Sequence, residues 1–151
     1  MRCHCIPVIK TDNEYMFLLN QTYGKKQWGG FSEEHGFEES YFKTAVKSAF
    51  DKTFGIIGIW SQLMKSEILN VVIRKDNYYC FLIVDMTFDN CDAINRVINY
   101  TRKSVVSDDI VATRWFYLDE ICSFKDVSSD LILVLLEDSH KFRNGPHLLD
   151  Q

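Results

Sequence analysis

The chain has 151 residues, of which 46% are hydrophobic and 14% are aromatic. This length supports one domain around a single core rather than two full domains. Charged residues make up 25% of the chain, with only seven glycines and two prolines, so the composition excludes disordered, collagen-like and mucin-like proteins. The net charge of −4 argues against strong nucleic-acid binding driven by overall charge.

The apolar segments indicate neither membrane insertion nor secretion. The longest runs, Cys80–Val84 and Leu131–Leu136, are far shorter than the roughly 20 apolar residues that span a bilayer. Residues 1–9 lack an apolar stretch of signal-peptide length. We therefore expect an intracellular protein of the cytosol or nucleus, with no membrane partner.

The five cysteines are odd in number and scattered along the chain. Cys3-His4-Cys5 would place two thiols on one face of a strand, but a zinc site needs four ligands and no second cluster follows. We interpret the cysteines as free thiols that behave as small apolar residues.

Alternating strands and helices are expected over residues 1–142, which would form one domain, with 143–151 as a loose tail. The expected strands are Arg2–Lys10, Tyr15–Leu19, Ile68–Arg74, Tyr78–Asp85 and Thr113–Leu118. The first two would form a hairpin, and residues 20–40 a long, functional loop. The expected helices are 41–54, Ala93–Thr101 and Ser129–Phe142. This mixture indicates an α/β or α+β sandwich, with a mixed β-sheet flanked by helices.

The helix over residues 41–54 has the clearest pattern, because its apolar residues recur at helical spacing. Ser40 is placed to cap its N-terminus and Gly55 to end it. The side chains expected to be largely buried are Val46, Phe50 and Phe54. Phe50→Ala would then cost about 3 kcal/mol of stability.

A specific order of features surrounds this helix. Trp28-Gly29-Gly30 is followed by an acidic loop, then by the helix, which leads into Gly55-Ile56. This order resembles the Nudix hydrolase family, whose motif is Gly, five residues, Glu, seven residues, Arg-Glu-apolar, one residue, Glu-Glu, one residue, Gly-apolar. The segment Arg114–Ile121 is similar to the late strand and turn of that family. The resemblance covers roughly residues 2–142 and implies a Nudix-like fold. It also implies that motif glutamates bind magnesium or manganese ions, and that these ions activate water to attack a diphosphate linkage.

The motif positions on the helix carry other side chains in this chain. Counted back from Gly55, the Glu-Glu positions hold Lys52 and Thr53. The Arg-Glu positions hold Ser48 and Ala49, and no register restores the set. The Nudix box is therefore degenerate.

The remaining charges on the helix do not replace the lost glutamates. The helix offers one carboxylate, Asp51, and Lys47 at i−4 is spaced to pair with it. A magnesium site requires several oxygen ligands, whereas this face carries mostly lysines. The sequence therefore predicts that hydrolysis is lost or weak, and that Lys47 and Lys52 either contact phosphate directly or simply face solvent.

The resemblance implies ligands in which a nucleoside diphosphate is linked to another group. Candidates are a nucleotide, an ADP-ribose-like compound or an RNA cap, with RNA as a further partner; the sequence names no protein partner. Tyr23 and Trp28 flank the glycines, where an aromatic ring can stack on a base or belong to the core. The candidate ligand-binding residues are Tyr23, Trp28, Gly29, Gly30, Lys47 and Lys52.

Two alternatives remain open from the sequence. The loop acids Glu33, Glu34, Glu38 and Glu39 either serve solubility or rebuild an active site. In the second case Glu38 and Glu39 would bind Mg or Mn, and Glu39 and Asp51 would act in catalysis by a divergent pyrophosphohydrolase. Without activity no cofactor is expected. The other alternative is a structural or interaction domain that binds no small ligand.

Overall fold

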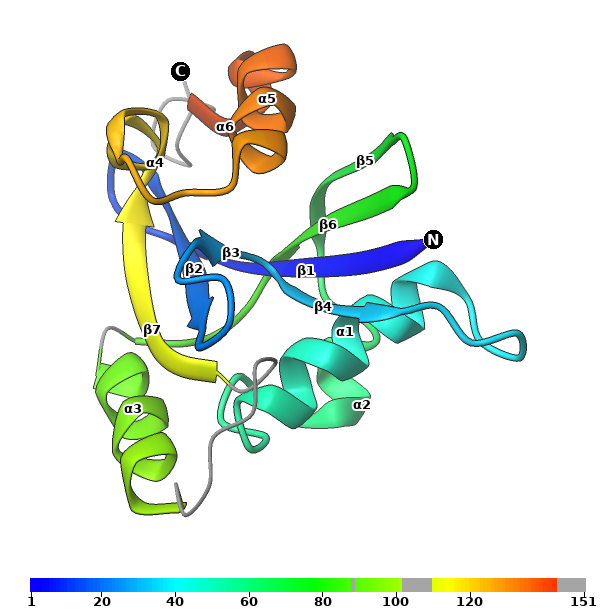
Figure 1. The fold of residues 1–151 in the computed structure, drawn as a ribbon, viewed down its shortest axis with the longest axis vertical. Helices are drawn as coiled ribbons and strands as arrows, with labels where there is room; N and C mark the ends of the chain where they lie inside the picture. The colour runs from blue at the N-terminus through cyan, green and yellow to red at the C-terminus, as the bar shows by residue number, and fades with distance from the viewer. Residues whose placement is uncertain (88, 102–109, 144–151) are drawn as a thin grey trace.

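The fold is described by a computed structural model for residues 1–87, 89–101 and 110–143 (Figure 1). The strands in these ranges are β1 (Arg2–Lys10), β2 (Tyr15–Thr22), β3 (Trp28–Gly29), β4 (Phe31–Glu34), β5 (Ile68–Arg74), β6 (Asn77–Ile83) and β7 (Ile110–Tyr117). The helices there are α1 (Tyr41–Lys52), α2 (Trp60–Leu63), α3 (Asp89–Thr101), α4 (Leu118–Ser123), α5 (Ser129–Glu137) and α6 (Ser139–Arg143). Helices lie on both faces of a mixed sheet, which confirms the predicted α+β sandwich. None of the described helices has the length and apolar character needed to cross a membrane.

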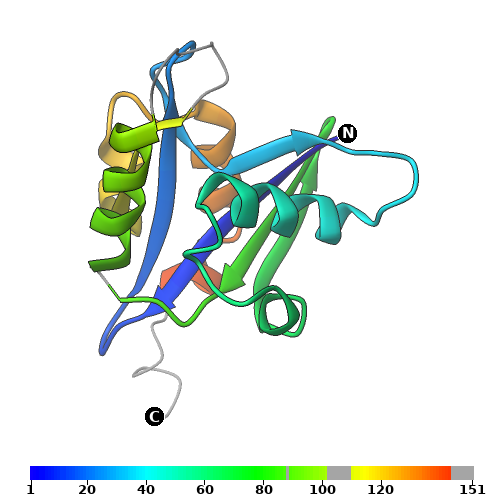
Figure 2. The ribbon, with the colours of Figure 1, turned by 90° about the horizontal axis from the view of Figure 1, so that it is seen from below.

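Strand β1 organises the sheet. One of its edges pairs in parallel with β6 over Arg2–Val8. The other edge is shared, because Arg2–Cys5 pair with β4 and Val8–Lys10 pair with β2, both antiparallel. Strand β2 goes on to pair with β3 and β7, and β6 pairs with β5. The sheet therefore splits beside Ile6 and Pro7, where β2 and β4 part from each other (Figures 1 and 2).

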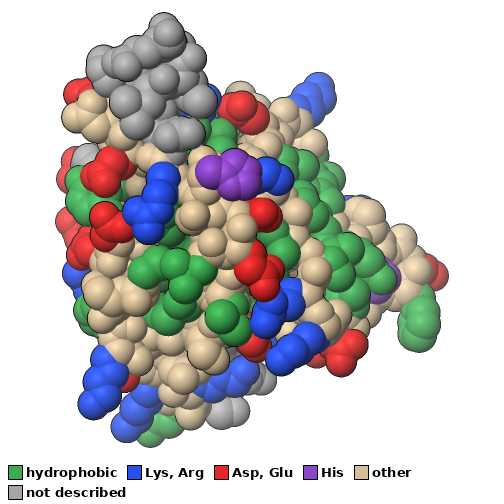
Figure 3. Space-filling model, turned by 90° about the horizontal axis from the view of Figure 1, so that it is seen from above, with side chains coloured by type: hydrophobic (Ala, Val, Ile, Leu, Met, Phe, Trp, Pro, Cys, Tyr) green, Lys and Arg blue, Asp and Glu red, His purple; other side chains and the backbone are tan. Residues whose placement is uncertain are grey.

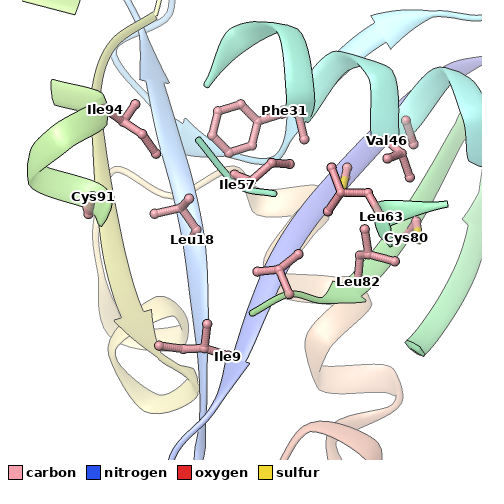
Figure 4. Packing of buried hydrophobic residues seen from close by; sticks show 14 of the residues in the cluster. Ile9, Leu18, Phe31, Val46, Ile57, Leu63, Cys80, Leu82, Cys91 and Ile94 are labelled. Carbon is pink, nitrogen blue, oxygen red and sulfur yellow. The ribbon is translucent and has the colours of Figure 1, made fainter. Parts of the chain in front are cut away.

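Each face of the sheet carries a hydrophobic core. Helices α1, α2 and α3 cover one face, against Ile9 of β1 and Leu18 of β2 (Figure 4). Helices α4, α5 and α6 cover the other face, against Ile6 of β1 and Phe17 of β2. Successive residues of a strand point to opposite faces, so a strand between two helical layers is apolar along most of its length.

Helix α1 begins as predicted. The Ser40 hydroxyl accepts a hydrogen bond from the backbone N–H of Lys43 at 3.1 Å, which caps the N-terminus. The helix ends at Lys52, two residues earlier than expected, and Gly55 then takes the left-handed conformation at φ +76°. Ser40 is therefore the N-terminal boundary that the sequence indicated, whereas the C-cap is Thr53 and Gly55 lies two residues beyond it.

The predicted burial of the α1 stripe is correct in part. Val46 is fully buried, and Phe50 is partly buried against Trp60, with ring centroids 5.4 Å apart. Phe54 is 48% exposed, so its predicted burial is wrong. The reason is that Phe54 lies beyond the helix with φ 58°, which turns its side chain off the helical stripe.

Other boundaries also differ from expectation. Residues 20–40 are not one long loop, because they contain the end of β2 and the short strands β3 and β4. The expected helix over Ser129–Phe142 is two helices that meet at Asp138. The predicted tail lies outside the described residues except for Arg143, which ends α6. The cysteines are free thiols as expected: four are buried and Cys122 is half-buried.

Candidate functional site

A cleft lies where the sheet splits, with a volume of about 110 Å³. We call it the glycine cleft, because Gly29 and Gly30 line it together with Trp28. The full lining is His4, Asn20, Thr22, Lys25, Gln27, Trp28, Gly29, Gly30, Ser32, Tyr79, Ser128 and Leu131. Strands β1, β2, β3, β4 and β6 and helix α5 all contribute, so the cleft exists only in the assembled fold.

Close packing explains the second glycine of the cleft. A Cβ on Gly30 would stand 3.1 Å from Cδ1 of Ile6 and 3.3 Å from Cβ of His4. The backbone can approach β1 this closely because no side chain intervenes. Beside it, the buried Asn20 amide Nδ2 donates to the carbonyl oxygen of Gly29 at 3.1 Å, which holds β3 in place.

Trp28 forms a fixed wall of the cleft. Its backbone N–H donates to the carbonyl oxygen of Asp126 at 2.7 Å, and its own carbonyl accepts from the N–H of Ser128 at 2.9 Å. Its ring packs edge-on against Phe116, with centroids 5.4 Å apart. The half-buried indole therefore contacts the core with one side and lines the cleft.

A stacked aromatic pair forms another wall. The His4 and Tyr79 rings lie 4.4 Å apart and nearly parallel, at 16°. Burial lowers the pKa of His4, and the nearby positive charges of Arg2 and Lys25 lower it further. The hydrogen bond between His4 Nε2 and Asn77 Oδ1, at 2.9 Å, acts in the opposite direction. Burial raises the pKa of Tyr79 to about 12. At neutral pH this wall is therefore an uncharged imidazole stacked on an uncharged phenol.

Positive charge gathers at the β4 side of the cleft. The Lys52 ammonium donates to the carbonyl oxygen of Ser32, a lining residue. Arg2 reaches the same residue, with Nε 3.0 Å from the Ser32 hydroxyl and Nη2 3.4 Å from the carbonyl oxygen. Lys25 also lines the cleft. The Glu34 carboxylate, whose Oε1 lies 3.6 Å from the Arg2 Nη1, offsets part of this positive charge.

Three of the other predicted residues, Glu39, Lys47 and Asp51, lie at a second hollow, on the solvent-facing side of α1. This α1 hollow has a volume of about 290 Å³ and is lined by Glu39, Lys43, Lys47, Phe50, Asp51 and Trp60. Lys47 was expected to pair with Asp51, but its Nζ lies 3.9 Å from Oε1 of Glu39. The structure therefore divides the predicted site residues between two places.

The loop acids do not come together as a metal site within the described residues. Glu34 lies 3.6 Å from the Nη1 of Arg2, and Glu39 accepts from the Thr44 hydroxyl at 3.4 Å as well as lying near Lys47. Among residues 1–87, 89–101 and 110–143, no group of three or more His, Cys, Asp or Glu side chains could hold a metal ion. This donor set does not fit the magnesium or manganese that the motif implies.

Three predicted residues line neither hollow: Tyr23, Glu38 and Lys52, of which Lys52 reaches the Ser32 carbonyl oxygen beside the glycine cleft. Tyr23 is exposed and is not among the described residues that line either hollow, and Glu38 is likewise exposed. Sequence reasoning instead missed His4, Tyr79 and Ser128 as lining residues. The chain carries no local signal for them, because they belong to β1, β6 and the start of α5.

No family model matches the sequence, and no curated protein matches it. The fold is similar to that of a C. elegans Ap4A hydrolase in a binary complex, with a TM-score of 0.62 and 12% identity over 93% of this chain and 96% of that chain. It is also similar to Shewanella oneidensis NrtR complexed with a 27mer DNA, with a TM-score of 0.57 and 13% identity over 93% of this chain. The alignment spans 61% of that NrtR chain, less than two thirds of its length.

A third similar structure is the NUDIX domain of Shewanella oneidensis NrtR complexed with ADP ribose. Its TM-score is 0.53, with 15% identity over 93% of this chain and 85% of that chain. Sequence identities this low support a shared fold but not a shared activity. The likenesses show that this chain has the Nudix fold, as its motif order implied.

Proposed function

Starting from a Nudix fold, we propose that the chain binds a nucleoside-diphosphate-linked ligand in the glycine cleft, without metal-dependent hydrolysis. The observation that carries this proposal is the contact between the Lys52 ammonium and the Ser32 carbonyl oxygen at the cleft. Lys52 occupies a position at which the family motif has a glutamate. A cation of the protein therefore lies where the motif would place a ligand of a metal ion.

The cationic side of the cleft would take the phosphates. Lys52, Arg2 and Lys25 supply positive charge, and ammonium and guanidinium groups make strong charge-assisted hydrogen bonds to phosphate oxygens. An ammonium attracts a diphosphate but does not generate a hydroxide nucleophile as a metal ion does. These groups therefore support binding rather than hydrolysis.

The aromatic walls would take the nucleoside. Trp28 lines the cleft, and the His4–Tyr79 pair offers uncharged ring surface. The volume of about 110 Å³ is smaller than the roughly 300–1,000 Å³ of typical ligand pockets. The cleft would therefore enclose one part of the ligand, a base or a ribose, and leave the phosphates at its rim.

Similar structures support the ligand class. One neighbour is a complex with ADP ribose and another is an Ap4A hydrolase, so a compound with linked phosphates and a nucleoside is the common chemistry. ADP-ribose-like compounds, nucleotides and an RNA cap all belong to this class. The acidic balance of this chain argues against the duplex DNA of the NrtR complex as its ligand.

Calorimetric titration in the presence of a chelator tests the proposal. The probes are ADP-ribose, a dinucleoside polyphosphate, a nucleoside triphosphate and capped RNA. We expect at least one to bind without metal, and Lys52→Met to weaken that binding by about tenfold or more, as for a lost charge-assisted hydrogen bond. Lys43→Met is the matched control, since Lys43 lies on the same helix at the α1 hollow and should leave the affinity unchanged.

Product release with magnesium or manganese separates the alternatives. Metal-dependent turnover that Glu39→Gln abolishes would overturn the proposal and indicate a pyrophosphohydrolase that uses its loop acids. The absence of both turnover and binding for every probe would instead indicate a structural or interaction domain.

A further inference from the structure

The loop between β4 and α1 presents an exposed aromatic side chain. Residues 35–40 project from the body of the molecule, and a hydrophobic side chain stands at the end of the projection (Figures 2 and 3). Phe37 in this loop is fully exposed, at 104%. The loop is held near its base, because the His35 N–H donates to the Met1 carbonyl at 2.9 Å and the His35 ring packs edge-on against Tyr41. An exposed phenyl ring on an anchored loop is a ready contact for an apolar pocket.

The charge around Phe37 restricts what can receive it. The flanking acids are Glu33, Glu34, Glu38 and Glu39, of which Glu34 lies near Arg2 and Glu39 near Lys47 of the same chain. Nucleic acids and anionic membranes would be repelled by these carboxylates. The complementary surface is therefore a protein pocket that is apolar inside and carries positive charge.

Such a pocket lies on this same chain. Between α3 and the turn after α1 there is a hollow of about 400 Å³, which we call the α3 pocket. It is lined by Ile56, Ala93, Arg96, Val97 and Tyr100. Arg96 is the charged residue of this lining, and Tyr100 is 90% exposed. A guanidinium beside an aromatic wall can both stack on a phenyl ring and pair with a carboxylate.

The loop cannot reach the α3 pocket of its own molecule, because helix α3 and the loop between β4 and α1 lie on opposite sides of the fold (Figure 1). We propose that Phe37 of one copy enters the α3 pocket of a second copy, with the loop carboxylates facing Arg96. An aromatic side chain buries roughly 150–250 Å². The contact therefore belongs to the small, transient class of interface, below about 1,200 Å² in total. Reciprocal exchange would close a two-fold dimer, whereas one-way exchange would build open chains.

Sedimentation velocity over micromolar to millimolar concentrations of the full chain tests this proposal. The wild-type chain should self-associate reversibly. Phe37→Ser removes the ring and Ala93→Trp fills the pocket, so each should weaken association by about tenfold or more. Ile73→Ser, which removes an exposed apolar side chain on β5, should leave it unchanged.

A mixing experiment makes the assignment specific. Phe37→Ser retains an intact pocket and Ala93→Trp retains an intact loop, so an equimolar mixture should associate more strongly than either variant alone. A wild-type chain that stays monomeric throughout would overturn the proposal, as would equal weakening by Ile73→Ser. Unchanged urea unfolding of the variants confirms that they fold, and the assay contains no nucleotide, so its outcome is independent of the function proposed for the glycine cleft.

Discussion

Of the two glycines that line the glycine cleft, Gly30 has less room for a side chain than Gly29. A Cβ there would stand 3.1 and 3.2 Å from two carbon atoms of Ile6 and 3.3 Å from Cβ of His4, which is closer than ordinary van der Waals contact. Ile6 is fully buried between the sheet and the α4–α6 layer, so it cannot move without disturbing that core. We therefore expect Gly30→Ala to lower the free energy of unfolding by about 1–3 kcal/mol, the usual cost of overpacking a core.

Gly36 provides a matched control within the same chain. A Cβ on Gly36 would meet nothing within 4 Å, and its φ lies outside the left-handed region. Gly36→Ala should be neutral or should raise stability by about 0.4–1 kcal/mol, because alanine restricts the unfolded chain.

Equilibrium urea unfolding, followed by the fluorescence of the three tryptophans, measures both changes. In thermal unfolding a loss of about 1 kcal/mol corresponds to a fall of roughly 2–4 °C in Tm for a chain of this size. The packing argument fails if Gly30→Ala unfolds at the same urea concentration as Gly36→Ala. It also fails if both variants are destabilised equally.

Three further predictions concern protonation, thiol reactivity and core packing. Burial lowers the pKa of His4 below its ordinary value of about 6.5, so the unfolded chain binds a proton at this side chain before the folded chain does. The contribution of His4 to the free energy of unfolding is therefore complete above about pH 6.5 and falls as the pH drops. His4→Gln should reduce the change in urea midpoint between about pH 7 and 5. A thiol reagent added to the native protein at mildly alkaline pH should label Cys122 before the four buried cysteines, and peptide mapping that finds equal labelling would contradict the burial pattern. Phe31→Ala should cost about 3–5 kcal/mol in urea unfolding and Phe54→Ala less than about 1 kcal/mol, since Phe31 is fully buried and Phe54 is half-exposed.

The hydrophobic pattern was enough to predict the long elements. Several apolar residues at strand or helix spacing occur in each of β1, β2, β5, β6 and α1. The sequence alone is therefore enough to predict whether each of these elements is a strand or a helix. Strands β3 and β4 have only two and four residues, too few for a period. Their pairing with β2 and β1 decides their conformation, so residues 20–40 looked like a loop.

The candidate site was predictable only where its residues are contiguous. Trp28, Gly29 and Gly30 share one short segment and carry the resemblance. His4 and Tyr79 meet because they are register partners in the parallel pairing of β1 with β6, a contact that no local pattern encodes. Closeness along the chain was a poor guide to closeness in space. The loop acids follow Gly29 and Gly30 closely in sequence, yet Glu39 lines the α1 hollow and not the glycine cleft.

The parallel pairing of β1 with β6 also constrains how the chain reaches its native state. In that pairing Arg2 lies opposite Asn77, so 75 residue positions separate two neighbours in the sheet. Bringing such distant segments together carries a loop-closure entropy that local hairpins avoid, and folding slows as contacts become less local. The β1–β2 hairpin can form early, but at a synthesis rate of about 5–20 residues per second β1 waits several seconds for β6. During that interval the thiols and aliphatic side chains of the first strand lack one of their two neighbouring strands, so aggregation during synthesis is the hazard that this topology creates.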